Sequence, residues 1–366
     1  MGQIRSEKPT QMGRQLGPDI VPSLPKNHQN TESSYFDIPV RNLQIDQTLE
    51  FDLYNKHALG RYVQVHSAGE NFTEASKASF KKAKIPTVFI PTSQRHRYNS
   101  YIETYLGHIL DDPKIPEIKK STILYKSATK LVQDMFEDPT SSENVLRTKK
   151  MVKNTVTHIL RGRACLASII RIMAYDYATY THSMNVCVFG IALGKRFGFS
   201  TLELNSLGAS LLLHDIGKSE INPAILKKQG PLTESEWNII KTHPAKGMEI
   251  LKSTGQFDRT VLTTVLQHHE KCSGRGYPGG LREPEIHLYA KIASLADVFD
   301  ALTTVRPYKN AIESFPAFRI MQEEMRGSFN CQLLRELILL MTSKNSMAQE
   351  DSQDDFGGDQ LNESAA

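Results

Sequence analysis

The feature that most constrains this chain of 366 residues is the run Leu-Leu-Leu-His-Asp-Ile-Gly-Lys at 211–218. His214 and Asp215 stand side by side directly after apolar residues. A neutral imidazole is a good metal ligand, and a carboxylate has two oxygens that can bridge two metal ions. The pair therefore predicts a buried metal site with hydrolytic chemistry.

More histidines and another aspartate occur in short motifs on both sides of this run. They are His182 in Thr-His-Ser-Met-Asn-Val, His243 in Lys-Thr-His-Pro, His268 and His269 in Gln-His-His-Glu, and Asp297 in Leu-Ala-Asp-Val-Phe-Asp. A single histidine on an apolar helix face is more often a hydrogen-bonded core residue than a ligand. Seven such groups within apolar helices would leave many buried polar atoms unpaired, which is costly. Together they predict a set of metal ligands.

These motifs, in this order, resemble the HD-GYP domain, the bacterial branch of the HD phosphohydrolases. The resemblance covers residues 150–330 and includes Gly-Tyr-Pro at 276–278, Ala-Asp-Val-Phe-Asp-Ala-Leu-Thr at 296–303 and Arg-Pro-Tyr at 306–308. It implies an enzyme, a metal-dependent phosphodiesterase that hydrolyses cyclic di-GMP to pGpG or GMP with a hydroxide activated by two metal ions.

The resemblance also implies two divalent metal ions that share one bridging carboxylate, Asp215. The ligands of one ion would be His182, His214 and Asp297, and those of the other His243, His268 and His269. Family habit favours iron or manganese, although imidazole and carboxylate ligands also suit zinc, nickel or cobalt. Members that hold a third metal have a carboxylate where this chain has Ala178, which cannot ligate. We therefore expect two metals.

Contacts with the substrate follow from the same resemblance. Lys218 would act with Asp215 in catalysis and meet a substrate phosphate. Tyr277 would stack on or hydrogen-bond to a guanine. Arg306 and Lys309 match positions that touch the phosphates of the cyclic dinucleotide. Each has a plainer alternative: Lys218 can neutralise acidic ligands, Tyr277 can pack in a turn, and Arg306 can cap a helix.

The chain departs from the family pattern at three positions. Ser273 and Val305 stand where members usually have Asp, and Arg275 stands where they have a small residue. Loss of the Asp at 273 would weaken the support of the histidine pair, which bears on turnover more than on metal binding. Two alternatives therefore stay open. One is a module that binds cyclic di-GMP without cleaving it, and the other is a phosphohydrolase of another nucleotide.

The texture of the sequence predicts an α+β protein, in which a small N-terminal α/β module precedes an all-α bundle of the HD type. Both ends of the chain are poor in apolar residues and are expected to be disordered. The predicted segments are a disordered arm at 1–34, the α/β module at 35–112, a connecting helix at 113–148, the HD-GYP-like domain at 149–342 and an acidic disordered tail at 343–366.

Alternating apolar residues predict four strands in the N-terminal module, and two helical stretches complete it. The strands are expected at Phe36–Val40, Thr48–Tyr54, Tyr62–His66 and Thr87–Ile90, and the helices at Glu74–Lys84 and Ser93–Leu110. Residues 68–71 are expected to form a turn. In the bundle, the segments from Ser200 to Glu203 and from Thr233 to Glu236 have the pattern of capping boxes and predict helix starts.

Composition indicates the compartment and the partners. The four cysteines, Cys165, Cys187, Cys272 and Cys331, lack the paired spacing of a disulfide framework or zinc ribbon, which predicts reduced thiols and a cytoplasmic location. No apolar run is long enough to cross a bilayer.

The expected partners are a cyclic dinucleotide and, through the N-terminal module or the Gly-Tyr-Pro loop, another protein. A nucleic acid polymer is not expected. The net charge is +4 at pH 7, and residues 346–366 contain acids but no Lys or Arg. The basic remainder suits a phosphate-bearing ligand, although scattered solvated lysines are the plainer explanation. The other histidines considered, His57, His66, His96, His108, His158 and His287, are expected to be structural or exposed.

Overall fold

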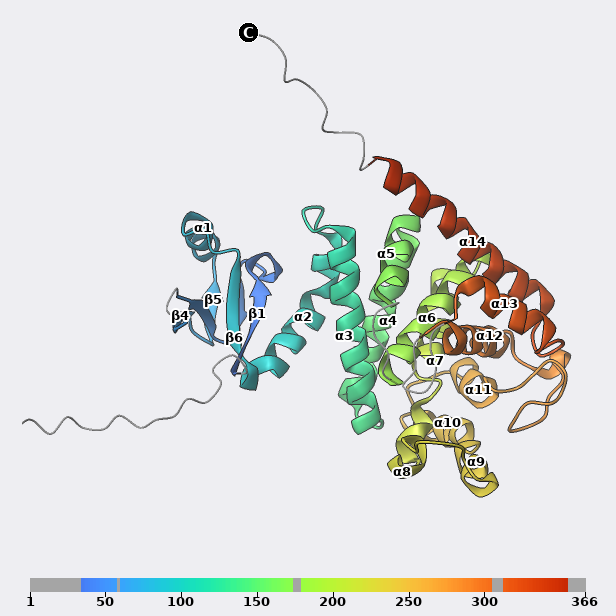
Figure 1. Ribbon diagram of the computed structural model, residues 1–366. Helices are drawn as coiled ribbons and strands as arrows, with labels where there is room; N and C mark the ends of the chain where they lie inside the picture. The colour runs from blue at the N-terminus through green and yellow to red at the C-terminus, as the bar shows by residue number, and fades with distance from the viewer. Residues whose placement is uncertain (1–33, 58–59, 174–178, 305–311, 355–366) are drawn as a thin grey trace, which may run out of the picture.

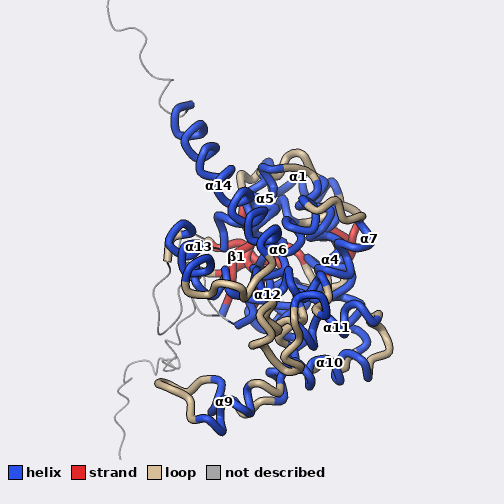
Figure 2. The backbone as a smooth tube through the Cα atoms, turned by 90° about the vertical axis from the view of Figure 1, so that its right-hand side faces the viewer, coloured by secondary structure: helices blue, strands red, loops and turns tan. Residues whose placement is uncertain are grey.

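The computed structural model describes residues 34–57, 60–173, 179–304 and 312–354. Two small antiparallel sheets form an N-terminal module, and helices make up the rest of the described chain (Figure 1). Seen from the helical side, the strands lie behind the helices (Figure 2). The α+β prediction is confirmed.

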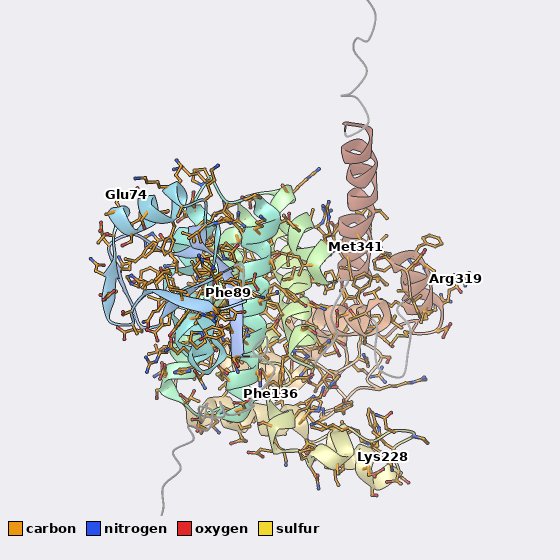
Figure 3. The ribbon with its side chains drawn as sticks, turned by 60° about the vertical axis from the view of Figure 1, so that its left-hand side comes forward. Glu74, Phe89, Phe136, Lys228, Arg319 and Met341 are labelled. Carbon is orange, nitrogen blue, oxygen red and sulfur yellow. The ribbon has the colours of Figure 1, made fainter. Side chains whose placement is uncertain are left out.

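The larger sheet of the module has the strand order β1-β6-β3-β4, and the smaller one pairs β2 with β5. The strands are β1 (Tyr35–Pro39), β2 (Gln47–Leu49), β3 (Leu53–Lys56), β4 (Tyr62–His66), β5 (Glu70–Phe72) and β6 (Thr87–Pro91). Helix α1 (Glu74–Lys82) lies between β5 and β6, and α2 (Arg95–Asp111) follows β6. Side chains from the sheets and α2 fill the core of this module (Figure 3).

Two expectations within the module are wrong. Segment 48–54 is not one strand, because β2 ends at Leu49 and β3 begins at Leu53 in a different sheet. Between them the backbone N–H of Asp52 donates to Gln94, and the Asp52 carboxylate accepts from the amide of Gln94, which turns the chain. The expected turn at 68–71 also contains the start of β5, because residues 70–72 pair with β2 and bury Phe72.

Twelve helices form the rest of the described chain, together with short 3-10 turns. The first four are α3 (Glu117–Glu137), α4 (Ser142–Leu160), α5 (Arg163–Met173) and α6 (Thr179–Arg196). Next come α7 (Thr201–Leu212), the 3-10 turn η4 (Ile216–Glu220), α8 (Pro223–Leu226), α9 (Glu234–Ile240) and α10 (His243–Ser253). The last are α11 (Arg259–Gln267), α12 (Leu288–Thr303), α13 (Ser314–Glu323) and α14 (Cys331–Asp354). Both predicted capping boxes are confirmed, at the starts of α7 and α9.

The segment expected as one connecting helix contains two. Helix α3 ends at Glu137 and α4 begins at Ser142. Pro139 explains the break, because proline lacks an N–H and disfavours helical backbone in the residue before it. Ser141 then caps α4 by accepting from the backbone N–H of Asn144.

The acidic tail is also different from the expectation. Helix α14 continues to Asp354, whereas disorder was expected from residue 343. Residues 343–354 contain neither glycine nor proline, so they can extend a helix that already exists at low cost. The rest of the tail and the N-terminal arm up to residue 33 lie outside the described residues.

Helix α2 joins the two parts of the molecule. Its Ile102 and Ile109 pack in the core of the N-terminal module, whereas Leu106 and Leu110 pack in the core of the helical bundle. Among the described residues, no helix combines the length and the apolar character needed to span a bilayer. Helices α8 and α9 project at one end of the bundle (Figures 1 and 2).

The buried His158 of α4 generates a prediction about stability. Burial lowers the pKa of His158 to about 4, against about 6.5 in an unfolded chain. Protonation therefore favours unfolding, so the stability that neutral His158 contributes is present above about pH 6.5 and is lost as the pH falls toward 4. Urea unfolding in the presence of a chelator measures this pH dependence of the free energy of unfolding. We expect wild type to lose about 1 to 2 kcal/mol more than His158→Gln between pH 7 and pH 5. Equal losses would contradict it.

Candidate metal centre

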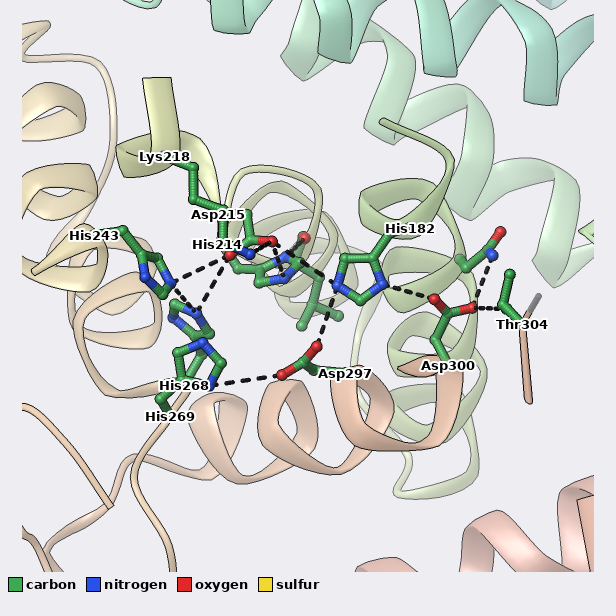
Figure 4. A network of polar contacts seen from close by, with 12 residues as sticks. His182, His214, Asp215, Lys218, His243, His268, His269, Asp297, Asp300 and Thr304 are labelled. Carbon is green, nitrogen blue, oxygen red and sulfur yellow. Dashed lines mark hydrogen bonds and ion pairs between the residues drawn. The ribbon is translucent and has the colours of Figure 1, made fainter. Parts of the chain in front are cut away.

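The structure brings all seven predicted ligands to one place inside the bundle (Figure 4). His182 lies in the first turn of α6, and Asp297 lies on α12. The His-Asp pair occupies the turn between α7 and η4. The remaining three are His243, which begins α10, and His268 and His269, which directly follow α11.

Three of the histidine rings are anchored in the same way. The Nδ1 atoms of His214, His243 and His268 lie 2.7, 2.8 and 2.6 Å from the carbonyl oxygen three residues earlier. A carbonyl can only accept, so in the neutral ring Nδ1 must carry the proton. The Nε2 atom of each ring is therefore a lone-pair acceptor, and it faces the centre of the cluster.

The unpaired acceptor nitrogens of these rings indicate whether a metal fits the site. His243 Nε2 and His268 Nε2 lie 3.1 Å apart, yet two acceptors cannot form a hydrogen bond with each other. His214 Nε2 is buried without a hydrogen-bond partner among the described residues. A cation bound by these nitrogens would remove both defects, because neutral imidazole is a ligand for Zn, Fe, Mn and related ions. The residues present fit a metal.

Asp215 lies between the two halves of the cluster. One of its oxygens, Oδ1, is 3.2 Å from His243 Nε2 and 3.9 Å from His268 Nε2. The other, Oδ2, is 3.5 Å from His214 Nε2 and 3.9 Å from His182 Nε2. Asp215 consequently belongs to two possible ligand groups, one with His182 and His214 and the other with His243, His268 and His269. This geometry suits a carboxylate that bridges two ions.

Asp297 lies between His182 and His269. Its Oδ1 lies 3.1 Å from His182 Nε2, and its Oδ2 lies 3.7 Å from His269 Nδ1. The other ring nitrogen of His182, Nδ1, lies 2.6 Å from Asp300 Oδ2, which fixes the orientation of the ring. Asp300 is one helical turn after Asp297 on α12, so one helix supplies both a direct contact and a supporting one.

The protonation states favour cation binding. Burial alone would raise the pKa of Asp215, but the positive charge of Lys218 outweighs it and holds this pKa well below its usual range. Burial lowers the pKa of His269 to about 3. His182 differs. Burial opposes its charge, but hydrogen bonds with Asp297 and Asp300 raise its pKa to about 9. A metal that binds His182 must therefore displace a proton.

Two glycines allow the close approaches on which this geometry depends. A Cβ atom on Gly217 would lie 2.0 Å from the carbonyl oxygen of His243, so only glycine lets η4 meet the start of α10. A Cβ atom on Gly276 would lie 2.4 Å from the backbone of Glu270 and Lys271. Glycine at these positions keeps the His-Asp turn and the Gly-Tyr-Pro loop close to the ligands.

The buried Glu270 holds the Gly-Tyr-Pro loop in place. Its carboxylate accepts hydrogen bonds from the backbone N–H groups of Gly279 and Leu281 at 2.6 and 2.9 Å. By contrast, the side chains of Ser273 and Arg275 are exposed. Glu270, which directly follows the histidine pair, therefore supports the loop without a contribution from the side chain of residue 273.

The expected substrate residues lie at the edge of the cluster where they are described. Lys218 forms an ion pair with Asp215, and about a quarter of its side chain is exposed (24%). The ring of Tyr277 lies 4.7 Å from that of His269 at 31°, and its backbone N–H donates to the carbonyl of His269. Arg306, Lys309, Val305 and Ala178 fall outside the described residues.

Sequence reasoning missed several residues of this site. Asp300 and Glu270 follow Asp297 and His269 closely in sequence, and this proximity was an available signal. Trp237 had no such signal. It lies on α9, 45% exposed, with its ring 6.3 Å from that of Tyr277 at 78°. It is the only tryptophan in the chain.

A third group of possible ligands lies outside this centre and has a simpler explanation. Glu117, His158 and Cys165 come together where α3, α4 and α5 meet. The ammonium of Lys120 is 2.9 Å from one oxygen of Glu117, and the thiol of Cys165 donates to the other at 3.1 Å. A lysine therefore already supplies the positive charge.

Comparison with known proteins agrees with this geometry. The HD domain family matches residues 177–332. The match identifies residues 177–332 as an HD domain. A cyclic di-GMP phosphodiesterase from Pseudomonas aeruginosa is 34% identical over 224 residues, which cover 61% of this chain and 54% of that protein. A 3'3'-cGAMP-specific phosphodiesterase from Vibrio cholerae is 38% identical over 152 residues, which cover 42% of this chain and 33% of that protein. This chain thus matches about half or less of the length of these relatives.

A solved structure supports the fold beyond the HD domain. An HDG"Y"P protein from Bdellovibrio bacteriovorus superposes with a TM-score of 0.61, covering 84% of this chain and 99% of that one, at 23% identity. At this identity the likeness concerns the fold alone. Together with the HD match and the curated relatives, it confirms the predicted resemblance to HD-GYP proteins, and the homologues of the HD domain include cyclic dinucleotide phosphodiesterases.

The bridging position of Asp215 generates a prediction about metal content. We expect protein purified without chelator to contain about two ions per chain, because Asp215 belongs to two ligand groups. Asp215→Ala should lose both ions, whereas His182→Ala should lose mainly one. His96→Ala, which removes an exposed histidine of α2, should keep both. Elemental analysis checks this, and equal metal content in wild type and Asp215→Ala would exclude the bridge.

Proposed function

We propose that this protein is a metal-dependent phosphodiesterase that hydrolyses cyclic di-GMP to pGpG or GMP. The observation that carries the proposal is the pair of buried ligand groups that share Asp215. The substrate class is supported by the relatives, whose names specify cyclic di-GMP and 3'3'-cGAMP. Iron or manganese is our proposed metal, because imidazole and carboxylate ligands suit both.

When bound, two divalent ions would make water acidic enough to act as a nucleophile near neutral pH and would withdraw charge from a phosphodiester. The chain's own residues position these events. The anchored rings of His214, His243 and His268 keep their Nε2 atoms directed inward. Lys218 adds a positive charge beside Asp215 on the accessible side, where a substrate phosphate would approach.

Aromatic side chains supply a surface for a nucleobase. Tyr277 lies over the ring of His269, and Trp237 approaches Tyr277 edge-on. Both are partly exposed, and Tyr277 also lies beside His269 and His243. Because base stacking on aromatic rings contributes substantially to nucleotide binding, we propose that Tyr277 contacts a base of the substrate. Arg306 and Lys309 remain proposed phosphate contacts.

The positions of Ser273 and Arg275 favour turnover over binding alone. Both side chains are exposed, and the Gly-Tyr-Pro loop is held by Glu270, which does not depend on residue 273. The backbone of Ser273 pairs with Arg282 and keeps the strand-like start of the loop. The departures at 273 and 275 therefore leave the candidate ligands and Glu270 in place.

A second substrate, 3'3'-cGAMP, is supported by one observation. The relative from Vibrio cholerae that is specific for 3'3'-cGAMP matches this chain at 38% identity over 152 residues, and a cyclic di-GMP phosphodiesterase response regulator from Xanthomonas campestris matches it at 38% over 153 residues. These two substrates differ in one base, so identity alone does not choose between them.

Product chromatography tests the proposal directly. Protein loaded with manganese or iron is incubated separately with cyclic di-GMP, 3'3'-cGAMP and a panel of other nucleotides. We expect linear product from cyclic di-GMP in wild type and in His96→Ala, and loss of at least about a hundredfold in His268→Ala, because a ligand of the metal is lost. Binding without product would favour the receptor alternative. Product from an unrelated nucleotide alone would favour the other hydrolase.

The contact of Tyr277 with a base has a separate test. Tyr277→Ala should weaken binding of cyclic di-GMP by about 1 to 3 kcal/mol, because it removes a stacking face. Tyr277→Phe keeps the ring and should bind nearly as wild type does. Fluorescence of Trp237 provides the binding curve, because this single tryptophan lies beside Tyr277. If Ala and Phe variants bind equally well, the tyrosine does not stack on the ligand.

A further inference from the structure

A chain of buried hydrogen bonds leads from the metal ligand His182 to a helix outside the HD domain. Tyr125 Oη on α3 donates to Asn185 Oδ1 on α6 at 2.7 Å. Asn185 Nδ2 donates to Asp300 Oδ1 on α12 at 2.8 Å. Asp300 Oδ2 lies 2.6 Å from His182 Nδ1. Three polar side chains thus connect α3 to a ring that faces the metal centre.

The donors and acceptors in this series of hydrogen bonds are fixed by their partners. Asp300 Oδ1 accepts from both Asn185 and Thr304, the latter at 2.8 Å, so its Oδ2 remains for His182. Because the carboxylate accepts, His182 Nδ1 is the donor, and the lone pair of neutral His182 is on Nε2, toward the metal. The hydroxyl of Tyr125 fixes the amide of Asn185 in the orientation that places Nδ2 toward Asp300.

All four side chains in this series of hydrogen bonds are buried. Tyr125 is 3% exposed, Asn185 0%, Asp300 1% and His182 5%. Water has little access to replace a missing partner, and a buried polar group that loses one is destabilised. Removal of the Tyr125 hydroxyl would leave Asn185 Oδ1 without this partner, and the amide could then reorient.

We infer that Tyr125 is a positioning residue of the metal centre, which acts on His182 through Asn185 and Asp300. The inference rests on the proposed metal-dependent function, because it assigns His182 as a ligand. It extends the centre to α3, which precedes the matched HD residues 177–332 and packs against α2 of the N-terminal module. The placement of α3 therefore contributes to the metal affinity of the HD domain.

The test compares Tyr125→Phe with Tyr289→Phe in the full chain. Tyr289 is a matched control, since it is also buried and its hydroxyl donates a hydrogen bond, to the backbone carbonyl of Glu203 at 3.2 Å, outside the chain of contacts. Manganese affinity is measured by competition with a chelator. Supporting partners of metal-bound histidines typically change affinity by about 10 to 100-fold, so we expect about a tenfold loss in Tyr125→Phe and no change in Tyr289→Phe.

A double-mutant cycle shows whether the effect passes through Asp300. Asp300→Ala removes the link to His182, so Tyr125→Phe added to it should cause no further loss of manganese affinity. Unchanged affinity in Tyr125→Phe, or losses that simply add, would overturn the inference. A wild-type protein that binds manganese but cleaves no cyclic dinucleotide would overturn the proposed function while this inference stands.

Discussion

The metal centre depends on hydrogen bonds between three histidine rings and the backbone. In each of His214, His243 and His268, Nδ1 donates to the carbonyl three residues earlier, and this leaves the lone pair of Nε2 directed at a common buried point. Two of these acceptors face each other at 3.1 Å, an arrangement that is unfavourable in a dry interior unless a cation lies between them. A cation bound at this point would therefore also stabilise this part of the bundle.

The candidate site could be predicted from sequence because its direct contacts lie in short motifs. An imidazole anchored three residues back needs only one turn of chain, so each motif carries its own geometry. The supporting residues could not be predicted in the same way. Asn185 is one of several polar residues in the first half of α6, and its partners Tyr125 and Asp300 are 60 and 115 residues away. Only the packed bundle shows that these side chains meet.

The elements of the fold that depend on neighbouring residues could be predicted from the sequence. Those that depend on contacts between distant residues were harder to predict. The capping boxes at Ser200 and Thr233 are local, and both are present. The break between β2 and β3 is not, because Leu49, Phe51 and Leu53 are all buried and continue the alternation of a single strand. What separates the two strands is the contact of the intervening residues with Gln94, 42 residues away.

Ion pairs and hydrogen bonds between helices connect the N-terminal module to the candidate metal centre. Arg147 of α4 forms two hydrogen bonds with Glu103 of α2 and one with Asp134 of α3, at 2.7 to 2.8 Å. The guanidinium of Arg147 therefore links α4 to both α2 and α3 through charge-assisted hydrogen bonds. Because α2 also contributes to the core of the N-terminal module, these contacts connect that module with α3. From α3 the hydroxyl of Tyr125 begins the buried hydrogen bonds to His182, so ion pairs and hydrogen bonds form a continuous set of contacts between the module and a predicted metal ligand.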